Sequence, residues 1–385
     1  MSGAAAPAEA AAPVAAAARL PLPVPLAVLA FRQPDLLARC DQAEWSVLLR
    51  QCASANLLAR LYYLLRERGE LDRVPAPARR HLEWSRTVAE RHSQAVHWEV
   101  TQIRHALAGL DTPLILLKGA AYAAAGLPPA RGRLFSDIDI LLPKDKLDDA
   151  ESALMLHGWA STHLDAYDQR YYREWMHELP PMEHVKRGSA IDVHHAILPQ
   201  TAPVHPDPAQ LRAAAQAVPG QPGLQILAPP DLVLHSATHL FFDGELEHGL
   251  RDLVDLDGLL RHYGGAPGFW PALQARAAQL QLQRPLFYAL RYSALLLHTP
   301  LPPEAQAAAA PGRPGALLLR LMDALYGRAL LPAHASCSDA WTPTARFLLY
   351  IRANWLRMPP LLLARHLFHK AFLSPKDKED QAEQP

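Results

Sequence analysis

The stretch over 114–142 constrains the fold of this chain more than any other. It reads LILLKGAAYAAAGLPPARGRLFSDIDILL. The pattern predicts an apolar strand over 114–117, a tight turn at Lys118 and Gly119, and then a helix of small residues. A loop rich in proline, glycine and arginine follows, and a second strand ends the stretch. A strand, a glycine turn and another strand within thirty or so residues indicate an α/β core.

The second strand of this stretch carries two acidic side chains. Side chains alternate along a strand, so Asp137 and Asp139 share one face while Ile138 and Ile140 are buried on the other. Two carboxylates held side by side repel each other unless a cation lies between them. Beside a glycine turn they predict a site for magnesium and phosphate. The alternative is an ordinary edge strand with a solvated polar face.

A third carboxylate is predicted on a later strand. The segments 182–186 and 190–197 are expected to form two strands, joined by a turn at Arg187-Gly188-Ser189. Asp192 and His194 share a face of the second strand. If that strand neighbours the first two aspartates, the three carboxylates form a metal-binding trio.

Composition limits the other possibilities. The 385 residues include 38 lysines and arginines and 38 aspartates and glutamates, so no overall charge recruits nucleic acid. The three cysteines form no CxxC pair, which argues against a disulfide framework or a structural zinc site. No apolar run reaches the roughly 20 residues that cross a bilayer. These features predict a soluble, cytoplasmic protein.

The rest of the chain is predicted to be largely helical. A proline- and alanine-rich segment at 300–314 indicates a linker. A basic, amphipathic segment at 345–372 predicts a packed helix with a weak membrane-surface or partner contact as the alternative. The predicted parts are a disordered leader at 1–20, a helical region at 21–110, an α/β core at 111–200, a helical domain on that core at 201–300, C-terminal helices at 301–373 and a disordered tail at 374–385.

Three motifs together resemble a known family. LKGAAYAAA…RGRLFSDIDILL, the helix that ends in HGW, and AIDVHHAI resemble the bacterial nucleotidyltransferase-like family, whose members carry an LKG turn, an Arg…DxD strand and a later D-x-H strand. The resemblance covers roughly 35–300. It implies an α+β fold: a small mixed sheet, similar to that of the DNA polymerase beta superfamily, between N- and C-terminal helical regions.

The resemblance also implies a chemistry. Asp137 and Asp139 would bind Mg²⁺ or Mn²⁺ that bridges the phosphates of a nucleoside triphosphate. Asp192 would be the third metal ligand and the candidate general base. His194, on the same strand face, is expected to orient Asp192.

The family pattern assigns phosphate binding to the glycine turn and the loop after it. The predicted nucleotide-binding residues are Lys118, Gly119, Arg131, Arg133 and Ser136. Lysine and arginine would neutralise phosphate charge, and glycine would let backbone N–H groups approach the triphosphate.

One departure from the family pattern leaves two functions open. The turn is usually Gly-Ser, whereas Ala120 follows the glycine here, so a hydroxyl contact to phosphate is lost. The leading hypothesis is a nucleotidyltransferase that moves a nucleoside monophosphate to a hydroxyl of a small molecule, sugar or protein. The alternative is a catalytically inactive nucleotide-binding or adaptor protein. A zinc hydrolase built on His235 and His239 is a third hypothesis, but HSATH lacks the glutamate of HExxH.

Overall fold

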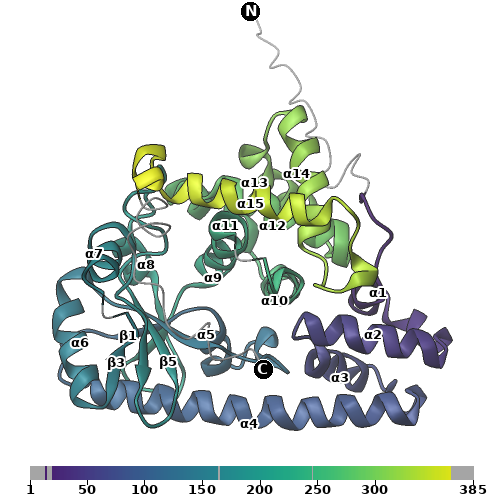
Figure 1. Cartoon of the computed structure of the whole chain (residues 1–385), viewed down its shortest axis with the longest axis horizontal. Helices are drawn as coiled ribbons and strands as arrows, with labels where there is room; N and C mark the ends of the chain where they lie inside the picture. Colours follow the sequence, from purple (N-terminus) through teal and green to yellow (C-terminus); the bar gives the residue numbers. More distant parts are fainter. Residues whose placement is uncertain (1–13, 15–19, 164, 245, 366–385) are drawn as a thin grey trace, which may run out of the picture.

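The computed structural model describes most of the chain (Figure 1). The described residues are 14, 20–163, 165–244 and 246–365. The predicted disordered tail, and all but residues 14 and 20 of the predicted leader, lie outside them.

In the described part of the chain, seven strands form one mixed sheet in the order β3-β4-β5-β2-β1-β7-β6. β2 pairs with β5 in parallel and with β1 in antiparallel, so it is an interior strand. The edge-strand alternative for the aspartate-bearing strand is therefore wrong. The strands are β1 Leu114–Leu116, β2 Asp137–Leu141, β3 Trp159–Ser161, β4 Met182–His184, β5 Ala190–His194, β6 Gln216–Ala217 and β7 Leu224–Ile226.

Helices precede, cover and follow this sheet, as the predicted α+β class requires. They are α1 Leu26–Arg32, α2 Gln42–Ser54, α3 Leu58–Glu67, α4 Ala76–Ala106, α5 Lys118–Ala124, α6 Leu147–Leu156, α7 Ala166–Trp175, α8 Pro208–Ala214, α9 Pro229–Thr238, α10 Gly249–Tyr263, α11 Phe269–Gln279, α12 Gln283–Leu297, α13 Pro303–Ala309, α14 Ala316–Ala329 and α15 Thr342–Arg357.

The 31-residue helix α4 connects the two ends of the molecule. It runs from the N-terminal helices α2 and α3 to the sheet and α6 (Figure 1). At the sheet end, Arg187 of the β4–β5 turn places its Nε 2.6 Å from Oε1 of Glu99 on α4. The Arg187 guanidinium also lies 4.8 Å from the ring centre of Trp159. The ion pair fastens the predicted hairpin to α4, and the stacking contact fastens it to β3.

Two predictions about the helical regions are wrong. Apolar residues recur at threes and fours from Leu48 to Leu65, a pattern that predicts one helix, but Asn56 adopts a left-handed φ of 54° and separates α2 from α3. The segment 300–314 is not a linker: it contains α13, whose alanines pack on α11 and α12. Alanine has a small apolar side chain that allows close helix packing, so composition alone did not distinguish α13 from a linker.

The C-terminal basic segment is only partly described. α15 buries Leu349 and Ala353 and packs on α14, while Phe347 and Trp355 are exposed. Contact of 345–372 with a membrane surface or a partner stays a prediction. Within the described residues, every helix is too short or too polar to span a lipid bilayer.

A buried ion cluster joins the helices to the loop that precedes β2. Asp255 of α10 accepts from Nε of Arg133 at 2.8 Å, and its other oxygen lies 3.7 Å from the Arg60 guanidinium of α3. The three side chains are between 7 and 13% exposed. Asp255 therefore contacts two buried cations that come from different parts of the chain, and Asp252 lies 4.0 Å from the Arg133 guanidinium as well.

Replacing Asp255 by alanine should destabilise the protein strongly. Breaking a buried pair by removing one partner typically costs roughly 3–5 kcal/mol, because the remaining charge is left uncompensated. Urea unfolding followed by circular dichroism measures the loss.

Glu67→Ala provides the matched control, since Glu67 pairs with Arg131 at the surface, where both side chains are more than half exposed. Its loss should be below about 1 kcal/mol. Equal losses in the two variants would contradict the burial argument.

Candidate functional site

The pairing of β2 with β5 brings two of the predicted acidic residues together. Asp139 and Asp192 are direct partners in the parallel register, so they project from neighbouring strands on the same face. One oxygen of each, together with a ring nitrogen of His194, lies in a group whose atoms are within 4.8 Å of one another. Two carboxylates and an imidazole at this separation are able to hold a metal ion.

Asp139 is buried between two basic groups. It is 4% exposed, its Oδ1 lies 3.5 Å from Lys118 Nζ, and the same oxygen is 2.9 Å from His194 Nε2. Burial alone would raise the pKa of this carboxyl, but Lys118 and His194 outweigh burial and hold the pKa well below its usual range. Asp139 is therefore a carboxylate at neutral pH.

Asp192 has the opposite electrostatic character. Burial, and then the charges of Asp139 and Glu178, raise its pKa to about 7. The two facing carboxyl groups thus do not both ionise easily at neutral pH. A cation between them would remove that repulsion.

Asp137 lies at the start of β2, two residues from Asp139 on the same strand face. It is half-buried, and Ser136 Oγ donates a hydrogen bond to its Oδ1 at 2.8 Å. Its charge also contributes to the raised pKa of Asp192. Asp137 is outside the three-residue group described above, and its role as a metal ligand stays a prediction.

Lys118 and Gly119, predicted to form a turn before a helix, are the first two residues of α5. Lys118 has a left-handed φ of 40°, which is uncommon for a residue with a side chain and is typical of functional sites. A Cβ on Gly119 would lie 2.4 Å from a guanidinium nitrogen of Arg133 and 2.7 Å from the Phe135 ring, so glycine is needed there. The Arg133 guanidinium therefore packs directly on the turn, and its charge is paired with Asp255.

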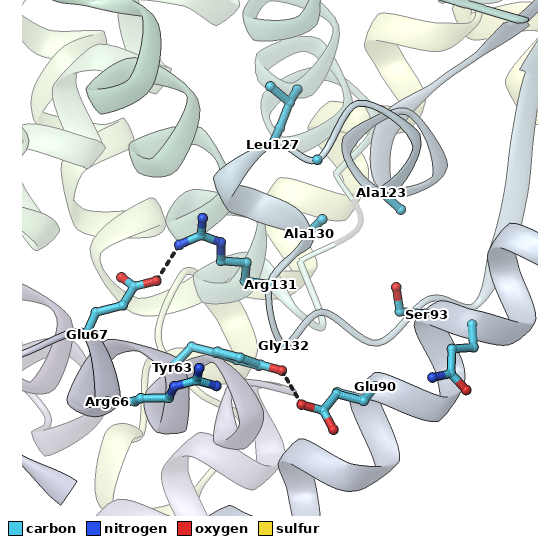
Figure 2. A pocket seen from close by; sticks show the side chains of 13 residues that line it. Tyr63, Arg66, Glu67, Glu90, Ser93, Ala123, Leu127, Ala130, Arg131 and Gly132 are labelled. Atoms are coloured by element: carbon cyan, nitrogen blue, oxygen red, sulfur yellow. Dashed lines mark hydrogen bonds and ion pairs between the residues drawn. The ribbon is translucent and has the colours of Figure 1, made fainter. Parts of the chain in front are cut away.

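Arg131 lies elsewhere, at a cavity of about 650 Å³ formed by α3, α4 and the segment after α5. Figure 2 shows its ion pair with Glu67 (2.5 Å) and the hydrogen bond from the Tyr63 hydroxyl to Glu90 (2.9 Å) across this cavity. None of the predicted aspartates lines the cavity. The phosphate-binding roles predicted for Arg131 and Arg133 stay predictions.

Sequence reasoning missed two residues beside the aspartates. Glu178 Oε2 lies 3.1 Å from His194 Nδ1, and His177 packs its ring near that of His194. Both residues precede β4 in an irregular segment. Such a segment has no helix or strand periodicity from which the direction of a side chain can be predicted. His194 was expected to orient Asp192, whereas its hydrogen bond goes to Asp139.

The histidines of the zinc hydrolase hypothesis lie near the aspartates without forming a ligand set of their own. The charge of Lys118 acts on His235, and that of His239 acts on Asp139. Burial, followed by Lys118, holds the pKa of His235 well below its usual range. Among the described residues, neither histidine belongs to a group of three metal-binding side chains.

The fold and the facing aspartates define a class of protein. A small mixed sheet with acidic residues on adjacent strands, enclosed by helices, is a nucleotidyltransferase-like core. The chain belongs to the uncharacterised nucleotidyltransferase family, whose model matches residues 41–298. No curated protein matches the chain, and no solved structure does. The family match confirms the predicted resemblance and supports a transferase activity.

The raised pKa of Asp192 should make stability depend on pH in metal-free buffer. Its pKa is 3.8 ordinarily and about 7 in the folded protein, so between these values the folded state holds a proton that the unfolded state releases. The contribution of Asp192 is therefore present below about pH 4 and is lost as pH rises towards 7. The free energy of unfolding should fall by no more than about 1.4 kcal/mol per pH unit on this account.

Urea unfolding at several pH values tests this contribution. The unfolding free energy of the wild type, taken relative to that of Asp192→Asn, should fall as pH rises. Asp149→Asn, at an exposed position on α6, is the control and should follow the wild type. A difference that stays constant from pH 4 to 7 would refute the assigned pKa.

Proposed function

We propose that this protein is a divalent-metal-dependent nucleotidyltransferase that moves a nucleoside monophosphate from a nucleoside triphosphate to a hydroxyl group. The acceptor is a small molecule, a sugar or a protein. The observation that carries the proposal is the direct pairing of Asp139 with Asp192, which places two carboxyl groups on adjacent interior strands. Burial and then repulsion from Asp139 raise the pKa of Asp192, and a bound cation would relieve that repulsion.

The available oxygen donors fit Mg²⁺ or Mn²⁺. Mg²⁺ prefers carboxylate oxygens and water, and it usually binds through one or two carboxylates together with substrate phosphates. Asp139 and Asp192 supply such carboxylates. Asp137, the partly exposed first residue of β2, is the third candidate metal ligand. The bound metal would neutralise the triphosphate and orient it for attack.

The remaining chemistry falls to side chains of the chain itself. Asp192 accepts the proton of the acceptor hydroxyl, because its raised pKa makes it the more basic of the two facing carboxyl groups. The acceptor oxygen then bonds to the α-phosphorus. The bond from that phosphorus to the bridging oxygen breaks, and pyrophosphate leaves with the electron pair.

Lys118 is the proposed partner of the phosphates. Its ammonium group lies 3.5 Å from Asp139 Oδ1, and the lysine side chain is one-fifth exposed. A metal ion at Asp139 would replace this contact and leave the ammonium group to bind phosphate oxygens. Arg133 supports the same turn by packing on Gly119, and Ser136 lies next to Asp137.

The adaptor alternative has one observation in its favour. Ala120 is 2% exposed within α5, where the family pattern expects a serine hydroxyl for phosphate. A protein of this kind would bind a nucleoside triphosphate with Mg²⁺ and release no pyrophosphate. Calorimetric titration and a turnover assay on the same preparation separate the two functions.

Asp139→Asn and Asp192→Asn should abolish nucleotidyl transfer. Loss of a positioned general base alone typically lowers the rate by about 10²- to 10⁴-fold, and loss of a metal ligand should be as severe. The measurement is transfer of an α-labelled nucleotide, with release of pyrophosphate, over a panel of hydroxyl acceptors.

Glu183→Gln is the matched control, because this carboxylate is exposed on β4 of the same sheet and lies outside the site. It should transfer nucleotide as the wild type does. Melting without metal should show that all the variants are folded. Unchanged transfer in either aspartate variant would contradict the proposal, whereas tight binding without turnover in the wild type would favour the adaptor.

A further inference from the structure

The ring of His194 lies between two carboxylates that come from different segments. Its Nε2 is 2.9 Å from Asp139 Oδ1, and its Nδ1 is 3.1 Å from Glu178 Oε2. The imidazole is 6% exposed. Since carboxylates only accept hydrogen bonds, a ring nitrogen that faces one carries either a proton or a metal ion.

His177 adds a third donor on the Glu178 side. One of its ring nitrogens, a Glu178 oxygen and a His194 nitrogen lie within 4.8 Å of one another. The His177 and His194 ring centres are 5.2 Å apart. His177 Nδ1 is buried and has no hydrogen-bond partner, although buried polar atoms are nearly always satisfied. A buried imidazole nitrogen without a protein partner, on a ring that packs beside a second imidazole and a carboxylate, is available to bind a ligand.

The backbone holds these donors in place. Glu178 forms an antiparallel bridge with His194, and the N–H of Leu179 donates to the Val193 carbonyl at 2.9 Å. The N–H of His195 donates to the His177 carbonyl at 2.8 Å. The segment that carries two donors is therefore fixed along the end of β5, which carries the third. Rigid elements of this kind are what a defined metal site needs.

We propose that His177, Glu178 and His194 form a binding site for a zinc-class dication. Two imidazoles and one carboxylate are a known ligand set for Zn²⁺ and leave a position open for water. Mg²⁺ prefers an all-oxygen site, so the two sites would select different metals. Nothing about this site requires the protein to be a nucleotidyltransferase.

Acidic and basic groups both lie around His194. Asp139, Glu178 and Asp192 surround His194 with acidic groups. The positive charges of Lys118 and Arg357 also act on this region.

Zinc at this site would also position the acidic pair, and this part of the inference rests on the proposed function. Metal-binding histidines almost always donate their second N–H to a carboxylate, which fixes the ring and the tautomer. His194 would bind zinc through Nδ1 and donate from Nε2 to Asp139. His194, Glu178 and His177 are then positioning residues for the carboxylate that faces Asp192.

The test measures metal binding by the full chain, without nucleotide. The protein is stripped with a chelator, dialysed and titrated with Zn²⁺ by calorimetry, and with Co²⁺ by visible absorption. We expect one zinc ion per chain and the absorption band of a nitrogen-bound cobalt ion. His177→Ala and Glu178→Gln should weaken zinc binding by more than the about 100-fold that loss of a residue that only hydrogen-bonds to a ligand can cost.

Two control variants locate the ion. His205→Ala removes an exposed histidine from another part of the chain, and Asp192→Asn removes a donor of the acidic pair only. Both should keep the zinc. Absence of zinc binding in the wild type, or retention of zinc by both His177→Ala and Glu178→Gln, would overturn the proposal.

Two further outcomes also decide the proposal. Loss of zinc in Asp192→Asn would place the ion at the acidic pair and overturn the separate site. Circular dichroism in chelator should show that Glu178→Gln is folded, so that its loss of zinc reports the missing ligand. Zinc binding without nucleotidyl transfer would support this site and count against the proposed function alone.

Discussion

The parallel pairing of β2 with β5 is the contact on which the site depends. It sets a buried Asp139 beside a partly buried Asp192 on interior strands, where water screens the repulsion between them only weakly. The surroundings shift the pKa values of the two carboxyl groups in opposite directions. Lys118 and His194 lower the pKa of Asp139 and keep it ionised, whereas burial and the neighbouring acidic groups raise the pKa of Asp192 to about 7. A pair of carboxyl groups with divided pKa values is typical of sites that bind metals or move protons.

The helices around the sheet shape the site as well as covering it. Asp255 of α10 fixes the Arg133 guanidinium, and Arg133 packs on Gly119 at the turn that presents Lys118. A chain of contacts thus runs from a helix that follows the sheet in sequence to the lysine beside Asp139. The glycine of the LKG motif has a packing reason in this chain that is separate from any contact with phosphate.

The acidic pair and the neighbouring histidines form a continuous polar network. His194 joins them, since one ring nitrogen faces Asp139 and the other faces Glu178. Oxygen donors predominate on the β2 side and nitrogen donors on the side of His177. This division of donor types is the chemical basis for assigning a hard and a borderline metal ion to adjacent positions.

The sequence by itself determined the local elements and their faces. Periodicity predicted β2, the β4–β5 hairpin and helical regions before and after the core, and alternation placed Asp137 with Asp139 and Asp192 with His194. Only the tertiary structure decided that Asp139 faces Asp192, that Arg133 pairs with Asp255, and that Glu178 reaches His194. Those contacts join segments far apart in the chain. These contacts depend on the strand order, the strand register and the path of irregular loops. A local pattern of side chains does not encode any of the three.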